Sequence, residues 1–528
     1  MKQISDQDAP DQQHMHCDLC IVGSGPAGIT LATEMAKSGL HIVVIESGQT
    51  AVNNKIQALN NIQSTGKAFR PNFINRLRML GGTSNLWPGR CMPLEPIDFS
   101  SRKWITHSGW PISYEEYAQY LPKAAKILGI ADSQADAKNL AMPSVAIPID
   151  LNTFSIKLAV WAKSPLRFAK KLNKRWASLS NISLVTGFTA CAYSFNQNAS
   201  RLEQIHCRSL SNKTLSISAT RFVLCSGGIE NARILLIAKQ QNPHATFDTD
   251  NVGRFFMDHP RAVKGEIRLN KGVNWGEFLG HPVAGGIKQM GIGLSAQVQQ
   301  QQQLLNSYIC LEPRANVVVA KSYDTAVQTV KQLMSKGGTS KRLNFTSLGL
   351  IAGMVYQLTP KEILPNWLYC IYCWLRSFLK EHKRDLVIIN QCEQLPNPDS
   401  RITLSNKTDT FGNPIASIHW QMSDAEIKSI QAIHQALGSW LKQQGIGELK
   451  TAVTDIQESD FDEASHHIGT TRMSNEPETG VVDSNLKLHG ISNLYVCGSS
   501  VFATSGSGNP TWSIVAFALR LANHLGKS

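Results

Sequence analysis

"CDLCIVGSGPAGITLATEMAKSGLHIVVIESG", residues 17–48, carries the parts of one folding unit in their required order. A β-rich run over 17–22 precedes the turn Gly23-Ser24-Gly25-Pro26-Ala27-Gly28, and a helix-compatible stretch leads to an apolar strand, 41–45, that ends on Glu46. Glycines in this pattern permit a tight turn, close approach of the backbone to a pyrophosphate, and close packing of the helix on the strand. Glu46, eighteen residues after the last glycine, is placed to accept hydrogen bonds from a ribose diol. The segment predicts a site for a dinucleotide without a 2′-phosphate, which leaves NAD or FAD.

The length and composition are those of a globular enzyme with two domains. The chain has 528 residues, whereas one domain usually has roughly 100 to 200. Hydrophobic residues make up 42% and charged residues 17%, and we find no run of about 20 apolar residues that would span a membrane. The first sixteen residues are polar and lack the apolar core of a secretory signal, so we expect a cytoplasmic protein.

The eleven cysteines, an odd number, are interpreted as reduced thiols rather than a disulfide framework. Cys17-x-x-Cys20 and Cys370-x-x-Cys373 have the spacing of zinc ligands. The first pair lies in an expected strand, where positions three apart point to opposite faces. We therefore expect no metal site.

About half of the net charge of +13 lies in one region. Residues 321–384 contain ten Lys or Arg against three acids, and "ILPNWLYCIYCWLRSFLKEHKR" (363–384) is an apolar, aromatic run flanked by positive charge. Two interpretations stay open: a core helix under a solvated basic face, which we favour, and a peripheral contact with an anionic membrane. No recognised nucleic-acid module accompanies the charge, so we expect no nucleic-acid partner.

Three further stretches carry glycine-rich turns at wide separations. They are "LGGTSNLWPGR" (80–90), "TRFVLCSGGIENARILL" (220–236) and "NLYVCGSSVFATSGSGNPTWSIVAFALRLANHL" (493–525). The second predicts a strand, a turn and a helix that begins near Glu230, and the third a strand, a loop and a closing helix from about Thr511. A single strand-helix-strand unit that binds NAD needs none of these stretches.

Together these motifs resemble the glucose-methanol-choline (GMC) oxidoreductases, a family of FAD-dependent alcohol oxidases and dehydrogenases. The resemblance covers nearly the whole chain and is weakest over about 270–385. Besides the N-terminal motif, it rests on Gly81-Gly82-Thr83-Ser84, Ser226-Gly227-Gly228, "NVGRFFMDHP" (251–260), "EQLPNPDSRITLS" (393–405) and the blocks around His466 and Asn509. It implies an α/β (α+β) fold, with a Rossmann-like FAD-binding domain of the GMC type and a second, sheet-containing substrate-binding domain.

The resemblance also implies domain boundaries. The FAD-binding domain is expected from 16–110, 181–262 and 456–528, the substrate-binding domain from 111–180 and 263–455, and a disordered tail from 1–15. One wall over the flavin is expected from a sheet that includes 385–421.

Carried over position by position, the resemblance assigns the cofactor to twelve residues. These are Gly23, Gly25, Gly28, Glu46, Gly82, Thr83, Asn85, Ser226, Gly498, Ser499, Pro510 and Thr511. Some relatives attach the flavin through a histidine at the position of Leu86. Because leucine has no nucleophilic atom, we expect FAD to be bound non-covalently.

The pair of histidines in "ASHHIGTTRM" (464–473) supplies the expected base. Oxidation of an alcohol by hydride transfer requires the hydroxyl proton to leave, and imidazole suits that task near neutral pH. The family's catalytic histidine stands three residues before the glycine of the Gly-Thr turn, which here gives His466, with His467 as the alternative. The family's second catalytic position, a histidine or asparagine, is Asn509, whose amide is expected to hold the substrate oxygen; a helix-capping role is the plainer interpretation of Asn509.

The substrate implied by the resemblance is an alcohol, and we favour a sugar, glycoside or polyol. Two alternatives stay open: a hydrophobic or lipid-like alcohol at a membrane surface, and a redox-silent, FAD-containing hydroxynitrile lyase. The electron acceptor, whether a quinone, a carrier protein or O2, is not fixed by the sequence. We favour a dehydrogenase over an oxidase because peroxide is harmful in the cytoplasm. Gln391, Glu393 and Gln394 are further candidates for substrate contact.

Overall fold

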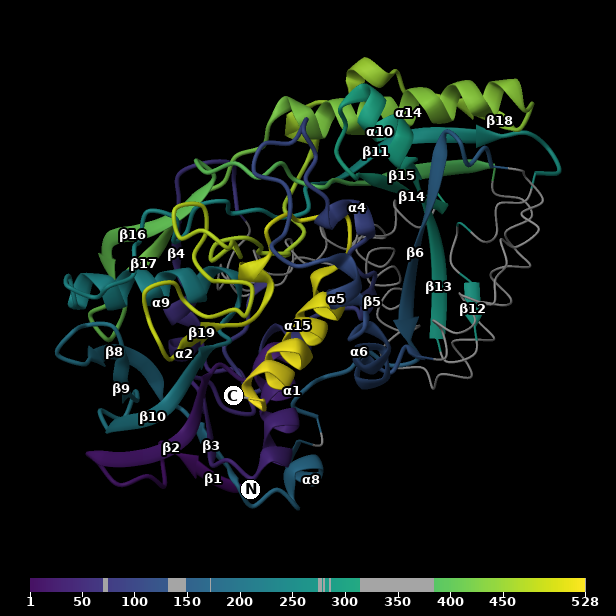
Figure 1. Cartoon of the computed structure of the whole chain (residues 1–528). Helices are drawn as coiled ribbons and strands as arrows, with labels where there is room; N and C mark the ends of the chain where they lie inside the picture. The colour runs from purple at the N-terminus through teal and green to yellow at the C-terminus, as the bar shows by residue number, and fades with distance from the viewer. Residues whose placement is uncertain are drawn as a thin grey trace, which may run out of the picture.

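The structure, a computed structural model, describes residues 1–69, 75–131, 149–170, 172–273, 278, 281–283, 286–313 and 384–527. Figure 1 shows a sheet near the two chain ends and a second sheet beside a long helix. The basic aromatic segment 363–384, except for Arg384, and the pair Cys370 and Cys373 lie outside the described residues. Among the helices that are described, none combines the length and the hydrophobicity that a membrane span needs.

The first sheet is mainly parallel and has the strand order β1-β7-β3-β2-β10-β9-β8, with β19 paired to β10. Its strands are β1 (Lys2–Ser5), β2 (Gln13–Val22), β3 (Ile42–Glu46), β7 (Ile182–Thr186), β8 (Thr189–Phe195), β9 (Leu202–Arg208), β10 (Thr214–Leu224) and β19 (Leu494–Val496). The pairs from β1 to β10, and β10 with β19, are parallel, whereas β9 pairs antiparallel with β10 and β8. Continuous apolar runs such as IVVIE of β3 are typical of parallel strands that are buried on both faces.

Three helices accompany this sheet: α1 (Pro26–Met35), α9 (Gly227–Gln241) and α15 (Pro510–Leu525). In Figure 1, α15 at the yellow end of the chain runs beside α1. The predicted helices near Glu230 and Thr511 are therefore present and begin within three residues of the expected positions.

The expected disordered tail over 1–15 is wrong. Lys2–Ser5 forms β1, which pairs in parallel with β7, and residues from Gln13 onward belong to β2. The first residues are mostly polar, so no hydrophobic pattern marks this edge strand, whose pairing is made by the backbone.

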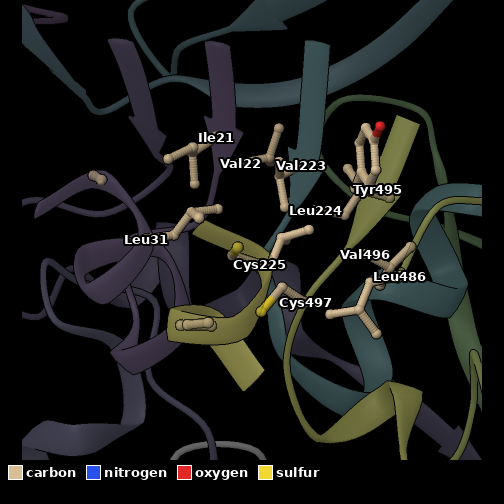
Figure 2. Packing of buried hydrophobic residues seen from close by; sticks show 14 of the residues in the cluster. Ile21, Val22, Leu31, Val223, Leu224, Cys225, Leu486, Tyr495, Val496 and Cys497 are labelled. Carbon is tan, nitrogen blue, oxygen red and sulfur yellow. The ribbon is translucent and has the colours of Figure 1, made fainter. Parts of the chain in front are cut away.

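The ends of the central strands are fixed by a shared core. Figure 2 shows Val22 of β2, Leu224 of β10 and Val496 of β19 packed together, with Leu31 of α1 on one side. These four side chains are at most 5% exposed. The packing holds the loops that leave the carboxyl ends of the strands, where open α/β sheets bind their ligands.

The second sheet is antiparallel and has the order β18-β11-β15-β14-β13-β6-β5, with β12 paired to β13. Its strands are β5 (Arg90–Cys91), β6 (Phe154–Ala162), β11 (Arg261–Leu269), β12 (His281–Val283), β13 (Gly286–Leu294), β14 (Tyr308–Pro313), β15 (Asp385–Gln391) and β18 (Gly447–Leu449). Helix α14 (Asp424–Gln443) packs against it through the buried Ile430, Ile433 and Leu437. Helix α10 (Ala296–Gln302) lies near α14 in Figure 1.

The region 385–421 does not form a single sheet. Its first strand, β15, lies in the second sheet, whereas β16 (Arg401–Thr408) and β17 (Pro414–His419) join β4 (Ile62–Ser64) in a separate three-stranded sheet. Ile402 and Trp420 of this third unit pack with Ile229 of α9. The expected wall over the flavin is therefore divided between two sheets.

Residues 114–128, expected in the substrate domain, pack on the last helix instead. They form α5 (Tyr114–Ala118) and α6 (Leu121–Leu128). The Tyr117 hydroxyl lies 2.7 Å from the Ser513 hydroxyl, and Trp512 donates to the Leu121 carbonyl over 3.1 Å. The short helices α2 (Asn54–Gln57), α4 (Pro96–Phe99) and α8 (Leu172–Trp176) complete the described α-helices.

Candidate active site

A cavity of about 400 Å³ lies where the carboxyl ends of β2, β3, β10 and β19 meet the starts of the three helices. Its wall runs from the first glycine loop to the two C-terminal blocks, and so it joins residues almost 500 positions apart. Ten of the twelve predicted cofactor residues line it: Gly23, Gly25, Glu46, Gly82, Thr83, Ser226, Gly498, Ser499, Pro510 and Thr511.

The glycines in and behind the wall are of two kinds: some allow close packing of the chain, and others leave open space. A Cβ atom at Gly28 would lie 2.0 Å from the Gly23 carbonyl oxygen, and one at Gly23 would lie 2.6 Å from the Cys225 carbonyl oxygen. At Gly25 and Gly227 a Cβ atom would meet no other described atom within 4 Å, and at Gly498 the nearest would be 3.9 Å away. The open spaces face the cavity, so the backbone can approach a flat or phosphorylated ligand there without a side chain between them.

Helices α1, α9 and α15 all begin at this wall. The residues at their N-caps are Gly25, Ser226 and Asn509, and among the described residues none caps its helix with a side-chain hydrogen bond. The first N–H groups of each helix therefore remain for a ligand, and the helix dipoles favour negative charge. This arrangement suits a dinucleotide diphosphate.

Glu46 ties the end of β3 to the first loop. Its carboxylate accepts hydrogen bonds from the Ser24 N–H (3.1 Å), the Ser24 hydroxyl (2.6 Å) and the Gly48 N–H (2.9 Å). The side chain is 6% exposed and lines the cavity. Each carboxylate oxygen can accept more than one hydrogen bond, so the predicted contact with a ribose hydroxyl remains compatible with this geometry.

A buried charge cluster lines the same end of the cavity. Glu230 lies between Arg78 (2.5 Å), Arg233 (3.1 Å) and Arg76 (3.5 Å), and Arg233 also pairs with Asp409 (2.6 Å). Burial alone would raise the pKa of Glu230, but the three guanidinium groups lower it to about 2. The cluster therefore holds Glu230 as a carboxylate in the wall of the cavity.

The loop 80–87 packs against Gly25 and forms part of the cavity wall. Gly82 has φ +56°, and a Cβ atom there would lie 3.2 Å from the Gly25 Cα atom. Asn85, which was expected to contact the cofactor, is not among the described residues that line the cavity. Its side chain donates to the carbonyls of Leu80 (3.0 Å) and Gly82 (2.9 Å). Asn85 therefore shapes the loop, and Leu86 lines the cavity and is 44% exposed.

His466 and Asn509 come together at the other end of the cavity. The His466 Nε2 atom lies 3.4 Å from the Asn509 Nδ2 atom, and both side chains are partly buried in the cavity wall. Burial, followed by the nearby His259, His467, Arg90 and Arg261, holds the pKa of His466 well below its usual range. The imidazole of His466 is therefore neutral at neutral pH.

His467 has a different environment. Its ring lies against those of Phe69 (5.3 Å between centroids) and Phe256 (6.2 Å), and its carbonyl accepts a hydrogen bond from the Ser499 hydroxyl (2.6 Å). The residue is 7% exposed, and burial lowers its pKa to about 3. This histidine supports the wall by packing.

Comparisons with known proteins agree with this geometry. A family model described as GMC oxidoreductase matches residues 396–518, and one described as pyridine nucleotide-disulphide oxidoreductase matches residues 17–86. A 2-methyl-1,2-propanediol dehydrogenase of Mycolicibacterium austroafricanum is 22% identical over 97% of this chain and 95% of its own length. Together these matches support a GMC family oxidoreductase. The chain is an FAD-dependent oxidoreductase of alcohols.

Two further relatives of this GMC oxidoreductase cover different shares of the chain. The large subunit of a fructose dehydrogenase from Gluconobacter japonicus is 25% identical over 58% of this chain and 47% of its own length. A solved fungal aryl-alcohol oxidase has a TM-score of 0.57 and 13% identity, covers 97% of this chain and 99% of its own, and so shares the fold.

Sequence reasoning did not find Asp258 and His259, although the block that contains them was part of the resemblance. The Asp258 carboxylate accepts the N–H of His259 (2.6 Å) and that of His466 (3.1 Å). The Nδ1 atoms of His259 and His466 lie 2.9 Å apart. The local signal for this part of the site was the adjacent pair Asp258-His259. Its partner, His466, lies more than 200 residues further along the chain.

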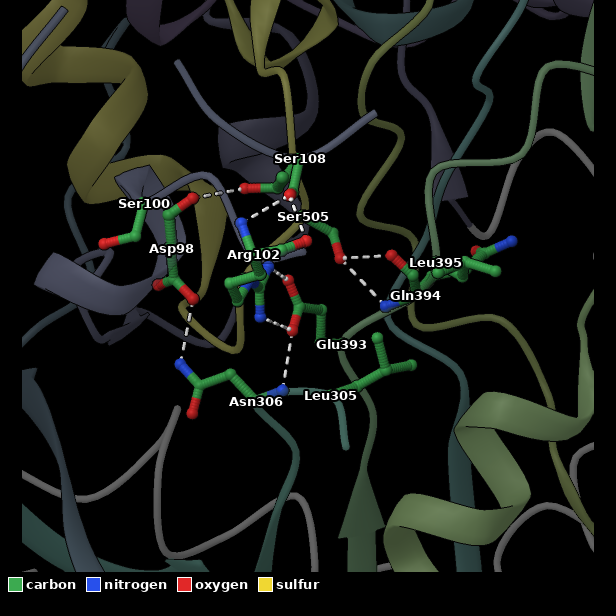
Figure 3. Close-up of polar contacts among 12 residues, drawn as sticks. Asp98, Ser100, Arg102, Ser108, Leu305, Asn306, Glu393, Gln394, Leu395 and Ser505 are labelled. Carbon is green, nitrogen blue, oxygen red and sulfur yellow. Dashed lines mark hydrogen bonds and ion pairs between the residues drawn. The ribbon is translucent and has the colours of Figure 1, made fainter. Parts of the chain in front are cut away.

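Glu393 and Gln394, candidates for substrate contact, point away from the cavity. Figure 3 shows Glu393 paired with Arg102, over 2.5 Å, and Gln394 in contact with Ser505. Both side chains are fully buried, and neither they nor Gln391 is among the described residues that line the cavity. Their contacts join the segment after β15 to the segment after α4 and to the loop after β19.

One group of potential metal ligands lies beside this site. Ligand atoms of Asp258, Glu463 and His467 are within 4.8 Å of one another. The Asp258 oxygens already accept three backbone N–H groups, including that of Ala464 (2.9 Å). This geometry describes a carboxylate that organises the loop around His466, and we assign it no metal.

Proposed function

We propose that this GMC oxidoreductase converts an alcohol to a carbonyl compound with His466 as the base. The observation that carries the proposal is the position of the His466 Nε2 atom, which lies beside the Asn509 amide in the wall of the cavity with open glycine loops. When bound, FAD supplies the hydride acceptor, N5 of its isoalloxazine ring.

The roles of the two side chains follow from their chemistry. The His466 Nε2 atom takes the hydroxyl proton, and the electron pair of the broken O–H bond helps to expel hydride from the adjacent carbon. The Asn509 Nδ2 group donates to the substrate oxygen and restricts the alcohol to a reactive orientation. The resulting imidazolium, beside the N-terminus of α15, keeps positive charge near the developing negative charge.

We also propose that FAD is dissociable. Leu86, at the position where some relatives carry a histidine that attaches the flavin, has no atom for a covalent bond. Acid precipitation of the purified yellow protein is expected to leave the flavin in the supernatant. Flavin fluorescence retained by the washed, denatured chain would contradict non-covalent binding.

The favoured substrate is a sugar, glycoside or polyol. Relatives named for 2-methyl-1,2-propanediol and for fructose support this class of hydroxyl-rich alcohol. A hydrophobic alcohol remains the second candidate, since a solved protein of the same fold is named for aryl alcohols. We favour a dehydrogenase that passes its electrons to a quinone or a carrier protein over an oxidase that uses O2.

Anaerobic mixing of the purified yellow protein with three sets of compounds tests the proposal. The sets are sugars and polyols, aliphatic and aryl alcohols, and a cyanohydrin. Loss of the flavin absorbance with the first set supports the favoured substrate class, and loss only with the second supports the hydrophobic alternative. Cyanide release with an unchanged flavin, or no bleaching by any alcohol, would contradict alcohol oxidation. Readmission of air, with peroxide measured, then separates an oxidase from a dehydrogenase.

A further inference from the structure

His259 lies directly behind His466 and is 2% exposed. Its Nδ1 atom is 2.9 Å from the His466 Nδ1 atom. On the other side of the ring, its Nε2 atom is 2.9 Å from the Gly506 carbonyl oxygen and 3.2 Å from the Ser505 carbonyl oxygen. The ring therefore bridges the loop after β19 and the predicted base.

These partners determine which nitrogen atoms carry hydrogen. Carbonyl oxygens only accept, so the His259 Nε2 atom must carry the proton and donate. Burial lowers the pKa of His259, so the ring is neutral and its Nδ1 atom holds a lone pair. The short contact between the two Nδ1 atoms then requires the His466 Nδ1 atom to donate, which leaves the lone pair of His466 on Nε2, the atom that faces Asn509.

We propose that His259 is a positioning residue that fixes His466 in the tautomer with hydrogen on Nδ1, so that Nε2 is the proton acceptor. The proposal rests on the proposed function, in which His466 is the base. Once His466 has taken the substrate proton, its Nδ1–H group donates a charge-assisted hydrogen bond to His259, which stabilises the cation. The neutral imidazole of His259 thus orients the base, as a carboxylate does in many catalytic triads.

The surroundings hold both rings in this relation. The Asp258 carboxylate accepts the backbone N–H of His259 and of His466, so one side chain anchors both residues. On the far side, the Ser505 hydroxyl accepts the Gln394 N–H over 2.9 Å, and Glu393 is fixed by Arg102, as Figure 3 shows. The two carbonyls that accept from His259 therefore belong to a loop that is tied to the second sheet.

A direct test reads the tautomer without any substrate. The FAD-loaded protein is labelled with 15N in its fifteen histidines, and the ring signals of His466 are assigned by their loss in His466→Gln. We expect hydrogen on Nδ1 of His466 and on Nε2 of His259. Hydrogen on Nε2 of His466 would overturn the proposal. Because no alcohol is needed, this result is independent of whether alcohol oxidation itself is confirmed.

Two matched variants separate positioning from support of the loop. His259→Gln keeps a donor near the Nε2 position, toward the carbonyls of 505 and 506, but has no acceptor at the Nδ1 position. His259→Asn keeps an acceptor near Nδ1 and loses the donor. Positioning predicts that His259→Gln slows flavin reduction by about 10²-fold or more and that His259→Asn slows it by no more than about 10-fold. The reverse order would show that anchoring the loop is the role of His259, and would contradict the proposal.

A double-mutant cycle gives the final control. If His259 acts through His466, His259→Gln has little further effect on flavin reduction in a His466→Ala background. Multiplication of the two separate effects would mean that His259 acts independently, and would overturn the proposal.

Discussion

The two ends of the cavity are built by different means. At the nucleotide end, the wall is mostly backbone: Gly25, Gly227 and Gly498 leave open space at the starts of helices or turns. At the catalytic end, the wall consists of side chains, His466 and Asn509, held by buried partners from distant segments. The first end is specified by short local motifs, and the second only by the tertiary fold.

This difference determines how each end is expected to respond to substitution. A substitution in the backbone wall is expected to act by steric collision, because an added methyl group meets either the chain or the ligand. A substitution in the side-chain wall is expected to remove a proton acceptor or donor, or to alter its protonation, while the fold persists. Separate measurements of folding, flavin content and flavin reduction therefore distinguish the two ends.

The largest effect is expected from Gly28→Ala. The added Cβ atom would lie 2.0 Å from the Gly23 carbonyl oxygen, so β2 and α1 would have to separate. We expect a loss of about 2 kcal/mol or more in stability, together with loss of the flavin. Thermal unfolding and the ratio of flavin to protein absorbance measure both quantities.

Gly25→Ala is the matched control for Gly28→Ala. Gly25 has φ −74°, which alanine adopts readily, and its Cβ atom would meet no described atom within 4 Å. We expect the FAD-free protein to unfold at the temperature of the wild type, but to bind FAD much more weakly. An unchanged flavin affinity would contradict the assignment of this open space to the cofactor.

Asn509→Ala tests the role of a side chain at the catalytic end. The Asn509 side chain makes no cap hydrogen bond to α15 among the described residues, so we expect stability to change by less than about 0.5 kcal/mol. Loss of the donor to the substrate oxygen should slow flavin reduction by about 10²-fold. A loss of about 1 kcal/mol in stability with a normal rate would instead identify Asn509 as a structural cap.

The effect that is smallest at neutral pH concerns acid stability. Burial lowers the pKa of His467 to about 3, whereas an unfolded histidine titrates near 6.5. Between these values the unfolded state binds one more proton, so this residue destabilises the fold as the pH falls below about 6.5, by about 1.4 kcal/mol per pH unit. Thermal melting of the wild type and of His467→Gln, from pH 7.5 to 4.5, should show a weaker acid dependence in the variant. Identical slopes would mean that His467 is not held neutral.

The nucleotide end could be predicted closely from sequence. Each feature there follows from its own motif of about thirty residues or fewer. These features are the strands around the first motif, the position of Glu46, and the starts of α9 and α15. Strand β1 and the placement of α5 and α6 on α15 did not follow, because their partners lie far along the chain and their own patterns are weak.

The catalytic end could be predicted only in part. The position of His466 relative to the Gly-Thr turn could be transferred from the family, but its contact with His259 depends on two loops that meet in space. Glu393 and Gln394 were expected near the substrate because they follow a strand of the second sheet. The Glu393 side chain points to Arg102, and the Gln394 side chain accepts hydrogen bonds from the Asp258 N–H and from Trp420. No local pattern reveals the direction in which a buried polar side chain turns.

The decisive measurement is the rate of anaerobic flavin reduction in His466→Ala, compared with the rate in His467→Ala. We expect both variants to retain FAD. The first should reduce its flavin about 10²-fold or more slowly than the wild type, and the second within about 10-fold of it. A His466→Ala variant as fast as the wild type would contradict the assignment of the base and the chemistry proposed for this cavity.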